Sequence, residues 1–177
     1  RKIASLPVEI EVFVHGSLCV SFSGECLMSS YFGGRSANRG RCAGPCRQKY
    51  KLISDGKALG DDYYLNMKDL SVIDNLDELL DIGVDCLKIE GRMKTPEYVF
   101  AAVANYKSKI EENTYNKNQM LDSSNRGYTK GFIFGQQRNY ITLKDDNKHR
   151  SVGKVSYTEG KKYFISNSDL YLGDNLE

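Results

Sequence analysis

Three apolar segments of the chain have the length and the boundaries of buried β-strands. They are VEIEVFVHG (residues 8–16), DYYLNM (62–67) and DCLKIEG (85–91). The first is rich in β-branched residues and closes on a glycine, which is typical of a strand followed by a turn. Short apolar runs of this kind predict strands that are buried on both faces, as in a parallel sheet.

Two other segments repeat their apolar side chains with the spacing of an α-helix. In residues 71–83 the repeating positions are Ile73, Leu76, Leu79 and Leu80, and a glycine at 83 suits the end of the helix. In residues 95–113, Thr95 is a suitable N-cap and Pro96 fits the first helical turn. We expect this second helix to bury one apolar stripe, which consists of Val99, Ala102, Val103, Tyr106 and Ile110.

The order strand, helix, strand, helix predicts a parallel α/β architecture for residues 1–113. Three strands are too few to close a barrel or to complete a doubly wound sheet. We therefore expect the chain to be the C-terminal piece of a longer protein, in which an upstream barrel half supplies the missing β/α units.

Two further regions follow this partial α/β domain. Residues 114–150 are polar and irregular, which indicates a linker, and they contain one distinct motif, NRGYTKGFIFG (125–135). Residues 151–177 alternate apolar and polar positions in short runs, with turn signals at 159–160 and 173–174. This pattern predicts the start of a small β-barrel domain.

The composition is that of an ordinary globular protein. The hydrophobic fraction is 40%, the charged fraction is 27%, and 25 basic against 23 acidic residues leave a net charge of +2. This balance gives no overall attraction to nucleic acid, so RNA contact would need a local basic patch. No apolar run approaches the ~20 residues of a membrane-spanning helix, and the N-terminal residues lack a signal-peptide cleavage site. We therefore expect a cytoplasmic protein.

Four of the five cysteines lie in a predicted loop over residues 16–50, at Cys19, Cys26, Cys42 and Cys46. An odd total and a reducing compartment favour metal binding or redox chemistry over disulfide bonds. Four thiolates suit either a zinc ion or an iron–sulfur cluster, and the gaps of six and fifteen residues between them favour the bulkier cluster. The alternative is four free, buried thiols. We expect Cys86, in the third predicted strand, to be a small core residue.

Polar side chains occupy one face of the first and third predicted strands. With a period of two residues, these faces carry Glu9, Glu11, Phe13 and His15, and Cys86, Lys88, Glu90 and Arg92. Barrel enzymes place their chemistry at the C-terminal ends of parallel strands, where His15, Glu90 and Arg92 lie. These three are our candidate catalytic residues. The alternative is a structural ion-pair network, for instance between Glu11 and Lys88.

Two basic segments, residues 34–51 and 91–94, are candidates for contact with RNA. The candidate residues are Arg35, Arg39, Arg41, Arg47 and Lys94, with Tyr31, Phe32 and Tyr50 available for base stacking. The alternative interpretation is a solvated loop. The sequence contains no Ser–His–Asp arrangement, H-E-x-x-H motif or phosphate-binding P-loop, so it offers no recognisable hydrolase site.

Five motifs together resemble the collagenase-like peptidase family U32. They are EVFVHGSLCVSFSGECLMSS, NRGRCAGPCR, YYLNMKDL, GVDCLKIEGRMKTPEYV and RGYTKGF, and they cover most of residues 8–134. The resemblance implies a TIM-type barrel with the cysteine loop after a late strand. Some members are named for collagen degradation. Others take part in prephenate-dependent hydroxylation of tRNA uridine to 5-hydroxyuridine, or in hydroxylation of a ribosomal RNA cytidine, and relatives in ubiquinone synthesis carry four-iron four-sulfur clusters.

Carried over by position, Cys19, Cys26 and Cys42 match the ligand positions of the family, and Cys46 matches the fourth cysteine of the RNA-hydroxylating branch. The resemblance therefore implies a four-iron four-sulfur cluster and a tRNA substrate, with a peptide or collagen substrate as the first alternative. A non-catalytic binding module stabilised by zinc is the second alternative. We expect the full-length protein to be the enzyme and this chain alone to be inactive, because it lacks about five of the eight barrel strands.

Overall fold

A four-stranded mixed sheet forms the centre of this computed structural model. The sheet has the order β5–β1–β4–β6, with β1 at Glu11–Ser17, β4 at Asp69–Ser71, β5 at Cys86–Ile89 and β6 at Tyr128–Thr129. Strand β1 pairs in parallel with β5 and antiparallel with β4, while β4 and β6 are parallel. The described residues are 3–22, 25–92, 94–123, 125–135, 139–143, 153–158 and 160–166.

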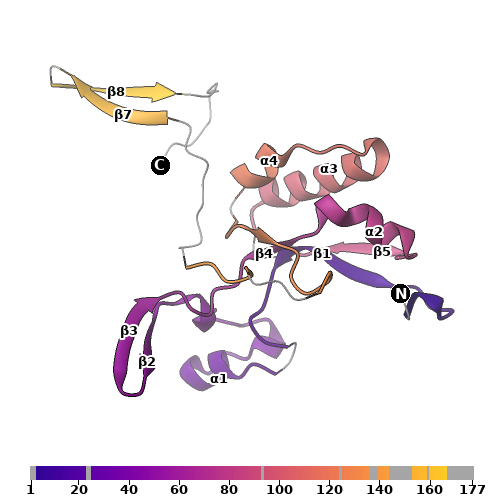
Figure 1. Ribbon diagram of the computed structural model, residues 1–177, viewed down its shortest axis with the longest axis horizontal. Helices are drawn as coiled ribbons and strands as arrows, with labels where there is room; N and C mark the ends of the chain where they lie inside the picture. Colours follow the sequence, from indigo (N-terminus) through magenta and orange to yellow (C-terminus); the bar gives the residue numbers. More distant parts are fainter. Residues whose placement is uncertain are drawn as a thin grey trace.

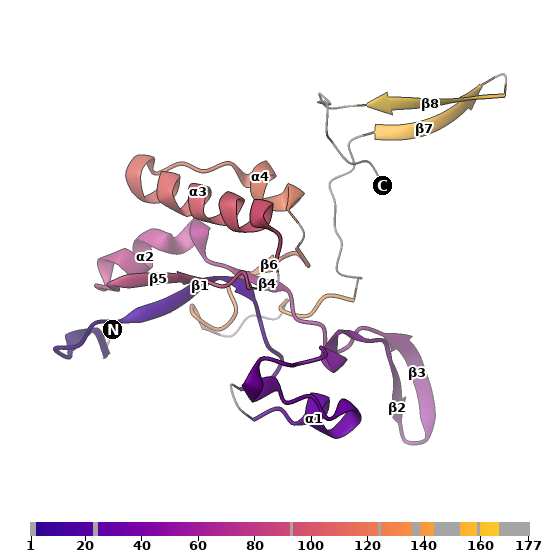
Figure 2. The same cartoon turned by 180° about the vertical axis from the view of Figure 1, so that it is seen from behind.

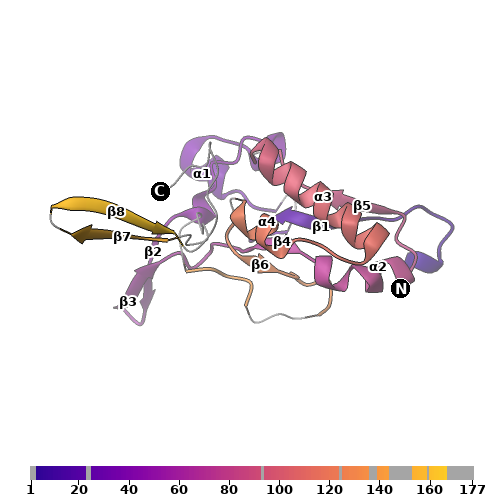
Figure 3. The ribbon, with the colours of Figure 1, turned by 90° about the horizontal axis from the view of Figure 1, so that it is seen from above.

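Helices cover one side of this sheet, and the cysteine loop lies on the other side (Figures 1 and 2). The helical side contains a 3₁₀ turn at Ile73–Asn75 followed by α2 at Leu76–Asp81, α3 at Pro96–Glu112 and α4 at Lys117–Asp122. Figure 3 looks onto this helical layer. The core lies between the sheet and the helices, and its buried members are Val14, Leu70, Val72, Ile73, Leu76, Leu79, Tyr106 and Met120.

Helix α3 begins where the sequence predicts it. The side-chain oxygen of Thr95 accepts a hydrogen bond from the backbone N–H of Tyr98 at 3.4 Å, and Pro96 occupies the first turn. The predicted stripe is wrong in part, because Val99, Val103 and Ile110 are exposed. The buried positions of the helix are Tyr98, Ala101, Ala102, Asn105 and Tyr106. The buried face of the helix therefore lies about one residue earlier in the chain than the predicted stripe.

The second predicted strand, residues 62–67, is not a strand. Its centre forms a turn in which the backbone N–H of Asn66 donates to the carbonyl of Tyr63 at 3.0 Å, and β4 begins only at Asp69. The chain returns from β1 to β4 through the cysteine loop and a hairpin, without a crossover helix, so the two strands run antiparallel. The mixed α/β class is confirmed, whereas the all-parallel sheet is wrong.

The first strand is not buried on both faces, and its alternation is interrupted. Phe13 is 51% exposed and pairs with Lys88, but the next pair in the register is His15 with Ile89, so one residue is inserted in β1. Such a bulge changes the face of the sheet toward which the following side chains point. His15 consequently faces the helices with Ile89, instead of lying on the outer face with Glu11 as the period of two predicts.

Two hairpins complete the described structure. Strands β2 at Tyr50–Ser54 and β3 at Lys57–Asp62 are joined by Asp55 and Gly56, whose φ angles are +50° and +72°. An Asp-Gly pair is a recognised hairpin signal, yet this hairpin was not among the predicted elements. Strands β7 at Gly153–Thr158 and β8 at Lys161–Ser166 form the hairpin predicted around 159–160, and the turn predicted at 173–174 lies outside the described residues.

Within the part of the chain that the structure describes, no helix is long and apolar enough to cross a membrane.

Candidate functional site

The cysteine loop begins at the C-terminal end of β1 and ends just before β2. It contains the short helix α1 at Met28–Gly33 and two 3₁₀ turns, at Ala37–Arg39 and Pro45–Arg47. All four of its cysteines are free thiols. Cys19 and Cys42 are exposed, whereas Cys26 and Cys46 are partly buried. The loop therefore presents its thiols near the surface on the non-helical side of the sheet.

The guanidinium of Arg47 joins the two ends of the loop. Its Nη2 donates to the carbonyl of Leu18 at 2.8 Å, so the residue after Cys46 is bonded to the residue before Cys19. Its Nη1 donates to Asn66 Oδ1 at 2.8 Å and to the carbonyl of Met67 at 2.9 Å. Arg47 therefore attaches the loop to the segment that precedes β4.

A second contact joins the two halves of the loop. The backbone N–H of Ala43 donates to Ser29 Oγ at 2.9 Å, and Ser29 is only 2% exposed. Ser29 lies three residues after Cys26, and Ala43 follows Cys42, so this bond brings the two inner cysteine segments together. The N–H of Gly44 also donates to Cys42 Sγ at 3.4 Å.

The thiols of Cys19, Cys26 and Cys42 are close enough to Cys46 to affect its pKa. Burial raises the pKa of Cys46, the Arg47 guanidinium opposes this effect, and the neighbouring thiols of Cys19, Cys42 and Cys26 raise it further. Even so, no three His, Cys, Asp or Glu side chains in the described ranges are placed to hold one metal ion. Four thiolates around a single zinc ion would lie about 4 Å apart, whereas a cluster of several iron atoms separates its ligands further. The donor set fits such a cluster by its chemistry.

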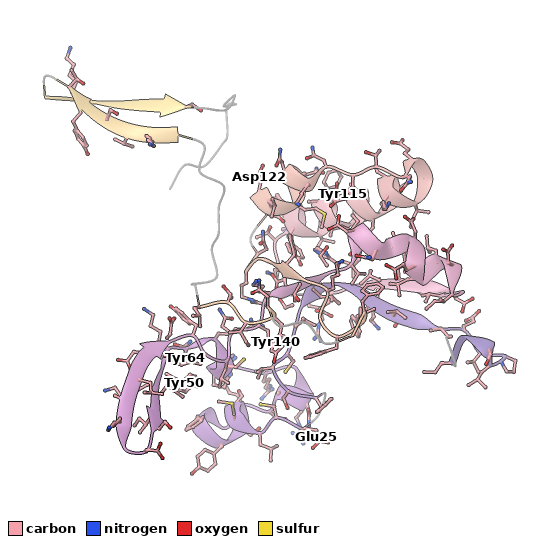
Figure 4. The ribbon with its side chains drawn as sticks, viewed as in Figure 1. Glu25, Tyr50, Tyr64, Tyr115, Asp122 and Tyr140 are labelled. Atoms are coloured by element: carbon pink, nitrogen blue, oxygen red, sulfur yellow. The ribbon has the colours of Figure 1, made fainter. Side chains whose placement is uncertain are left out.

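An open, mostly apolar cleft of ≈ 740 Å³ lies beside Cys19. Phe13 on β1 and Phe22 after it form part of its wall, and Tyr64 and Phe132 contribute further aromatic rings. Tyr140, which also lines the cleft, lies between the sheet and the cysteine loop in Figure 4. A molecule in this cleft would contact Cys19, the first cysteine of the loop.

His15 lies in a buried ring of tyrosines on the helical side of the sheet. Its ring is 5.4 Å from that of Tyr98, 5.6 Å from that of Tyr106 and 5.4 Å from that of Tyr128, and it is 1% exposed. Burial lowers its pKa to about 4, since a charged imidazole would lose its hydration there. His15 Nδ1 and the Tyr98 hydroxyl have no hydrogen-bond partner among the described residues. His15 is therefore neutral at pH 7 and inaccessible to a large substrate.

A buried carboxylate beside this ring binds two cations. Asp69 is fully buried, its Oδ2 lies 3.2 Å from Lys94 Nζ, and its Oδ1 pairs with Arg126 Nη2. Arg126 Nε also donates to the carbonyl of Met67 at 2.9 Å, which is the same oxygen that Arg47 binds. Buried charges persist only when they are paired in this way. The result is one polar network that runs from Lys94, just before α3, to the cysteine loop.

The sequence interpretation missed Asp69 and Arg126 as members of this network. A signal was present, because both lie in motifs on which the family resemblance rests, in YYLNMKDL and RGYTKGF. Of the candidate catalytic residues, His15 and Glu90 are joined through their backbones, since the N–H of Glu90 donates to the carbonyl of His15 at 2.9 Å, but their side chains have different partners. Arg92 Nε binds Glu90 Oε1 at 2.9 Å in a largely exposed pair, whereas His15 is next to Asp69 and Lys94.

The ion-pair alternative is confirmed for the outer face of β1 and β5. Lys88 Nζ binds Glu11 Oε1 at 2.6 Å, and this bond holds the pKa of Glu11 below its usual value. Cys86 Sγ lies 3.5 Å from Glu11 Oε2. Cys86 is exposed on this face, so its assignment to the core is wrong. The reason is that the face carrying Glu11 and Lys88 is open in this chain.

The predicted RNA-binding residues fall into two groups. Arg35, Arg39 and Arg41 are exposed on the cysteine loop, where the rings of Tyr31 and Phe32 also face solvent and lie 5.3 Å apart. Their contact with RNA stays a prediction. Arg35 Nε donates to the carbonyl of Arg41 at 3.0 Å. The head groups of Arg47 and Lys94 are also engaged within the protein. Arg47 binds carbonyls of the loop and of residue 67, and Lys94 binds Asp69 with its side chain 16% exposed.

The chain matches the family model described as Peptidase family U32 over residues 1–143. It is 35% identical to a collagenase of Porphyromonas gingivalis over 191 residues, which is 96% of this chain and 53% of that relative. It is 37% identical to the tRNA hydroxylation protein P1 of Bacillus subtilis over 112 residues, covering 59% of this chain and 26% of the relative.

A third relative is a 23S rRNA 5-hydroxycytidine synthase of Escherichia coli. The identity is 44% over 104 residues, which is 58% of this chain and 16% of that protein. The chain thus spans about half the length of the collagenase and less of the other two relatives. No solved structure matches the chain.

Proposed function

Because the chain belongs to peptidase family U32, we propose that the longer protein hydroxylates RNA with a four-iron four-sulfur cluster on Cys19, Cys26, Cys42 and Cys46. The proposed reaction is the prephenate-dependent conversion of a tRNA uridine to 5-hydroxyuridine in the cytoplasm. The similarity to proteins named for tRNA and rRNA hydroxylation supports this reaction class.

The observation that carries the proposal is the way in which the loop joins its thiols. Arg47 bonds the neighbours of Cys46 and Cys19, and Ser29 bonds the segments of Cys26 and Cys42. A surface loop with incidental thiols has no need of two such contacts, each of which is partly buried. When bound, a cluster would supply one-electron redox chemistry at the mouth of the cleft.

The surroundings of the loop support an RNA substrate. Three arginines and two aromatic side chains on its outer surface offer charge for phosphates and flat rings for unpaired bases. The cleft beside Cys19 offers an apolar, aromatic space of ≈ 740 Å³ for the base that reacts. In this proposal the loop binds the RNA strand, and the cleft receives the nucleobase.

We place this site at the mouth of a TIM-type barrel. The parallel pairing of β1 with β5 and the helices on one side of the sheet agree with such a barrel, although the antiparallel β4 departs from it. The exposed side chains on the other side, Phe13 and Lys88 among them, would then face the barrel interior.

The test uses the full-length protein, purified without oxygen. We expect about four iron and four sulfide per protein, a loss of both in Cys19→Ala, and no loss in Cys86→Ala, a matched cysteine outside the loop. Mass spectrometry of tRNA nucleosides from a deletion strain should show loss of 5-hydroxyuridine, which the wild-type gene restores and Cys19→Ala does not. Iron-free wild-type protein with an unchanged fold would remove the cofactor from the proposal.

Peptide hydrolysis is the second candidate, since the relative named collagenase matches 96% of this chain. His15, the histidine among the described residues, offers no accessible general base because it is 1% exposed and surrounded by tyrosines. Cleavage of gelatin by purified full-length protein, abolished by one point substitution, would establish this activity. If the protein instead contains one zinc ion and Cys19→Ala keeps all activity, the loop is a structural zinc module.

A further inference from the structure

We infer that Arg47 and Ser29 are positioning residues that hold the four cysteines as two pairs, Cys19 with Cys46 and Cys26 with Cys42. This inference rests on the proposed cluster and assigns a task to residues that are not ligands. It also gives Arg47 a role other than the predicted contact with RNA.

The first pair depends on the geometry of one guanidinium. Arg47 and Leu18 are 29 positions apart in the chain, and Nη2 of Arg47 binds the carbonyl of Leu18 at 2.8 Å. Since each residue is the direct neighbour of a cysteine, this bond brings Cys19 and Cys46 to the same place. The opposite Nη1 is occupied by Asn66 and by the carbonyl of Met67.

The same guanidinium ties the first pair to the rigid part of the fold. Asn66 is 1% exposed and Met67 is 4% exposed, and the Met67 carbonyl also accepts from Arg126. A planar guanidinium can bind three acceptors in fixed directions, which a lysine ammonium on a flexible stem cannot reproduce. Arg47 therefore fixes both ends of the loop relative to the segment before β4.

The second pair depends on a buried serine. Ser29 lies on α1, three residues after Cys26, and its hydroxyl accepts the N–H of Ala43, 14 positions further along the chain. Ser29 is 2% exposed whereas Ala43 is exposed, so this bond is shielded from water at its serine end. Cys42, which precedes Ala43, is consequently held against the helix that follows Cys26.

Residues that orient metal ligands typically change metal affinity by roughly 10- to 100-fold when they are removed. We expect an effect of this size for Arg47→Gln, with an intermediate effect for Arg47→Lys. Ser29→Ala should weaken cluster retention to a smaller extent, because it removes one bond and leaves the first pair intact.

The experiment uses the full-length protein with variants Arg47→Gln, Arg47→Lys and Ser29→Ala. Arg39→Gln, an exposed arginine of the same loop, and Ser30→Ala, the next residue of α1, are the matched controls. The first readout is the iron content after anaerobic reconstitution and the rate at which a chelator removes the iron. The second readout is cross-linking of the iron-free protein with a short bis-maleimide, with the linked cysteine pairs mapped by mass spectrometry.

We expect Arg47→Gln to lose iron at least tenfold faster than wild type and to lower the Cys19–Cys46 cross-link several-fold. The Cys42–Cys46 cross-link, between cysteines four positions apart, should be unchanged and serves as the internal reference. Ser29→Ala should lower the Cys26–Cys42 cross-link selectively, and both controls should match wild type.

If Arg47→Gln retains iron and forms cross-links to the same extent as the wild-type protein, the inference is overturned, even when the wild-type protein holds a cluster. If wild-type protein binds no iron, the proposed function fails, and the cross-links alone decide whether the cysteines are paired. If circular dichroism shows that Arg47→Gln is unfolded, Arg47→Lys, which keeps the charge, decides the question by the same two readouts.

Discussion

Two tyrosines of α3 that contact the same histidine should respond differently to loss of their hydroxyl groups. The hydroxyl of Tyr106 donates to the carbonyl of Val14 at 2.6 Å and accepts the N–H of Val72 at 3.2 Å. Both partners are fully buried. The hydroxyl of Tyr98, which is 1% exposed, has no hydrogen-bond partner among the described residues. The substitutions Tyr106→Phe and Tyr98→Phe change one atom each.

The expected magnitudes follow from these contacts. A buried hydrogen bond contributes about 0.5–1.5 kcal/mol net, so the loss of two bonds in Tyr106→Phe should cost about 1–3 kcal/mol. Tyr98→Phe removes a hydroxyl that gains nothing from burial, so the free energy of unfolding should stay within about 0.5 kcal/mol of wild type or rise.

Urea unfolding followed by far-ultraviolet circular dichroism measures this difference. With a typical slope of roughly 1–3 kcal/mol per molar urea, Tyr106→Phe should lower the midpoint by about 1 M. Equal slopes for the three proteins are the control, because they show that the substitutions leave the unfolded state unchanged. If Tyr98→Phe is as destabilised as Tyr106→Phe, the Tyr98 hydroxyl has a partner in solution, and the reasoning is refuted.

Three further results are expected. Because burial lowers the pKa of His15 from 6.5 to about 4, protonation favours the unfolded state, so stability should fall by about 3 kcal/mol from pH 6.5 to pH 4. In His15→Phe the urea midpoint should no longer show this fall between pH 6.5 and pH 4. If the midpoint of His15→Phe depends on pH as that of wild type does, the lowered pKa of His15 is contradicted. Asp69→Asn removes the buried carboxylate that both Lys94 and Arg126 bind, and it should lower the free energy of unfolding by about 3–5 kcal/mol. Glu11→Gln, in the exposed pair, should change it little, and equal effects of the two substitutions would argue against the buried network. Gly16→Ala should lower the melting temperature, since the φ angle of Gly16 is +133° and a Cβ there would lie 2.6 Å from the Glu90 carbonyl oxygen. Gly33→Ala places its Cβ in open space and should leave the melting temperature unchanged. A wild-type melting temperature for Gly16→Ala would contradict the close approach to Glu90.

The local elements were largely predictable from the sequence. Thr95, Pro96 and the apolar spacing that follows predict a helix over 95–113, and the helix extends from Pro96 to Glu112. The β-branched run at 8–16 covers all of β1 except its last residue, Ser17, and the turn signal at 159–160 lies between β7 and β8 in the sequence. These predictions succeed because capping, side-chain branching and turn conformation depend on residues within a few positions of each other.

The candidate site was predictable in its location and less so in its internal assignment. The spacing of the four cysteines singled out residues 16–50, which is the segment that the Arg47 and Ser29 contacts organise. The partners of Arg47 and the role of Asp69 were not predictable, because nothing near them in the sequence indicates which distant carbonyl or cation they meet. The exposure of Cys86 was also missed, since alternation does not reveal which face of a strand is covered.

The sequence by itself determined the mixed α/β class, the family and the gathering of four thiols in one loop after the first strand. Only the tertiary structure decided that β4 runs antiparallel to β1, and that an inserted residue in β1 turns His15 toward the tyrosines of α3 and β6. It also decided that Arg47 faces the carbonyls of Leu18 and Met67. Strand register, the direction of a side chain beyond a bulge and the partners of a long cation all depend on segments that are distant in the chain, and those segments meet only when it folds.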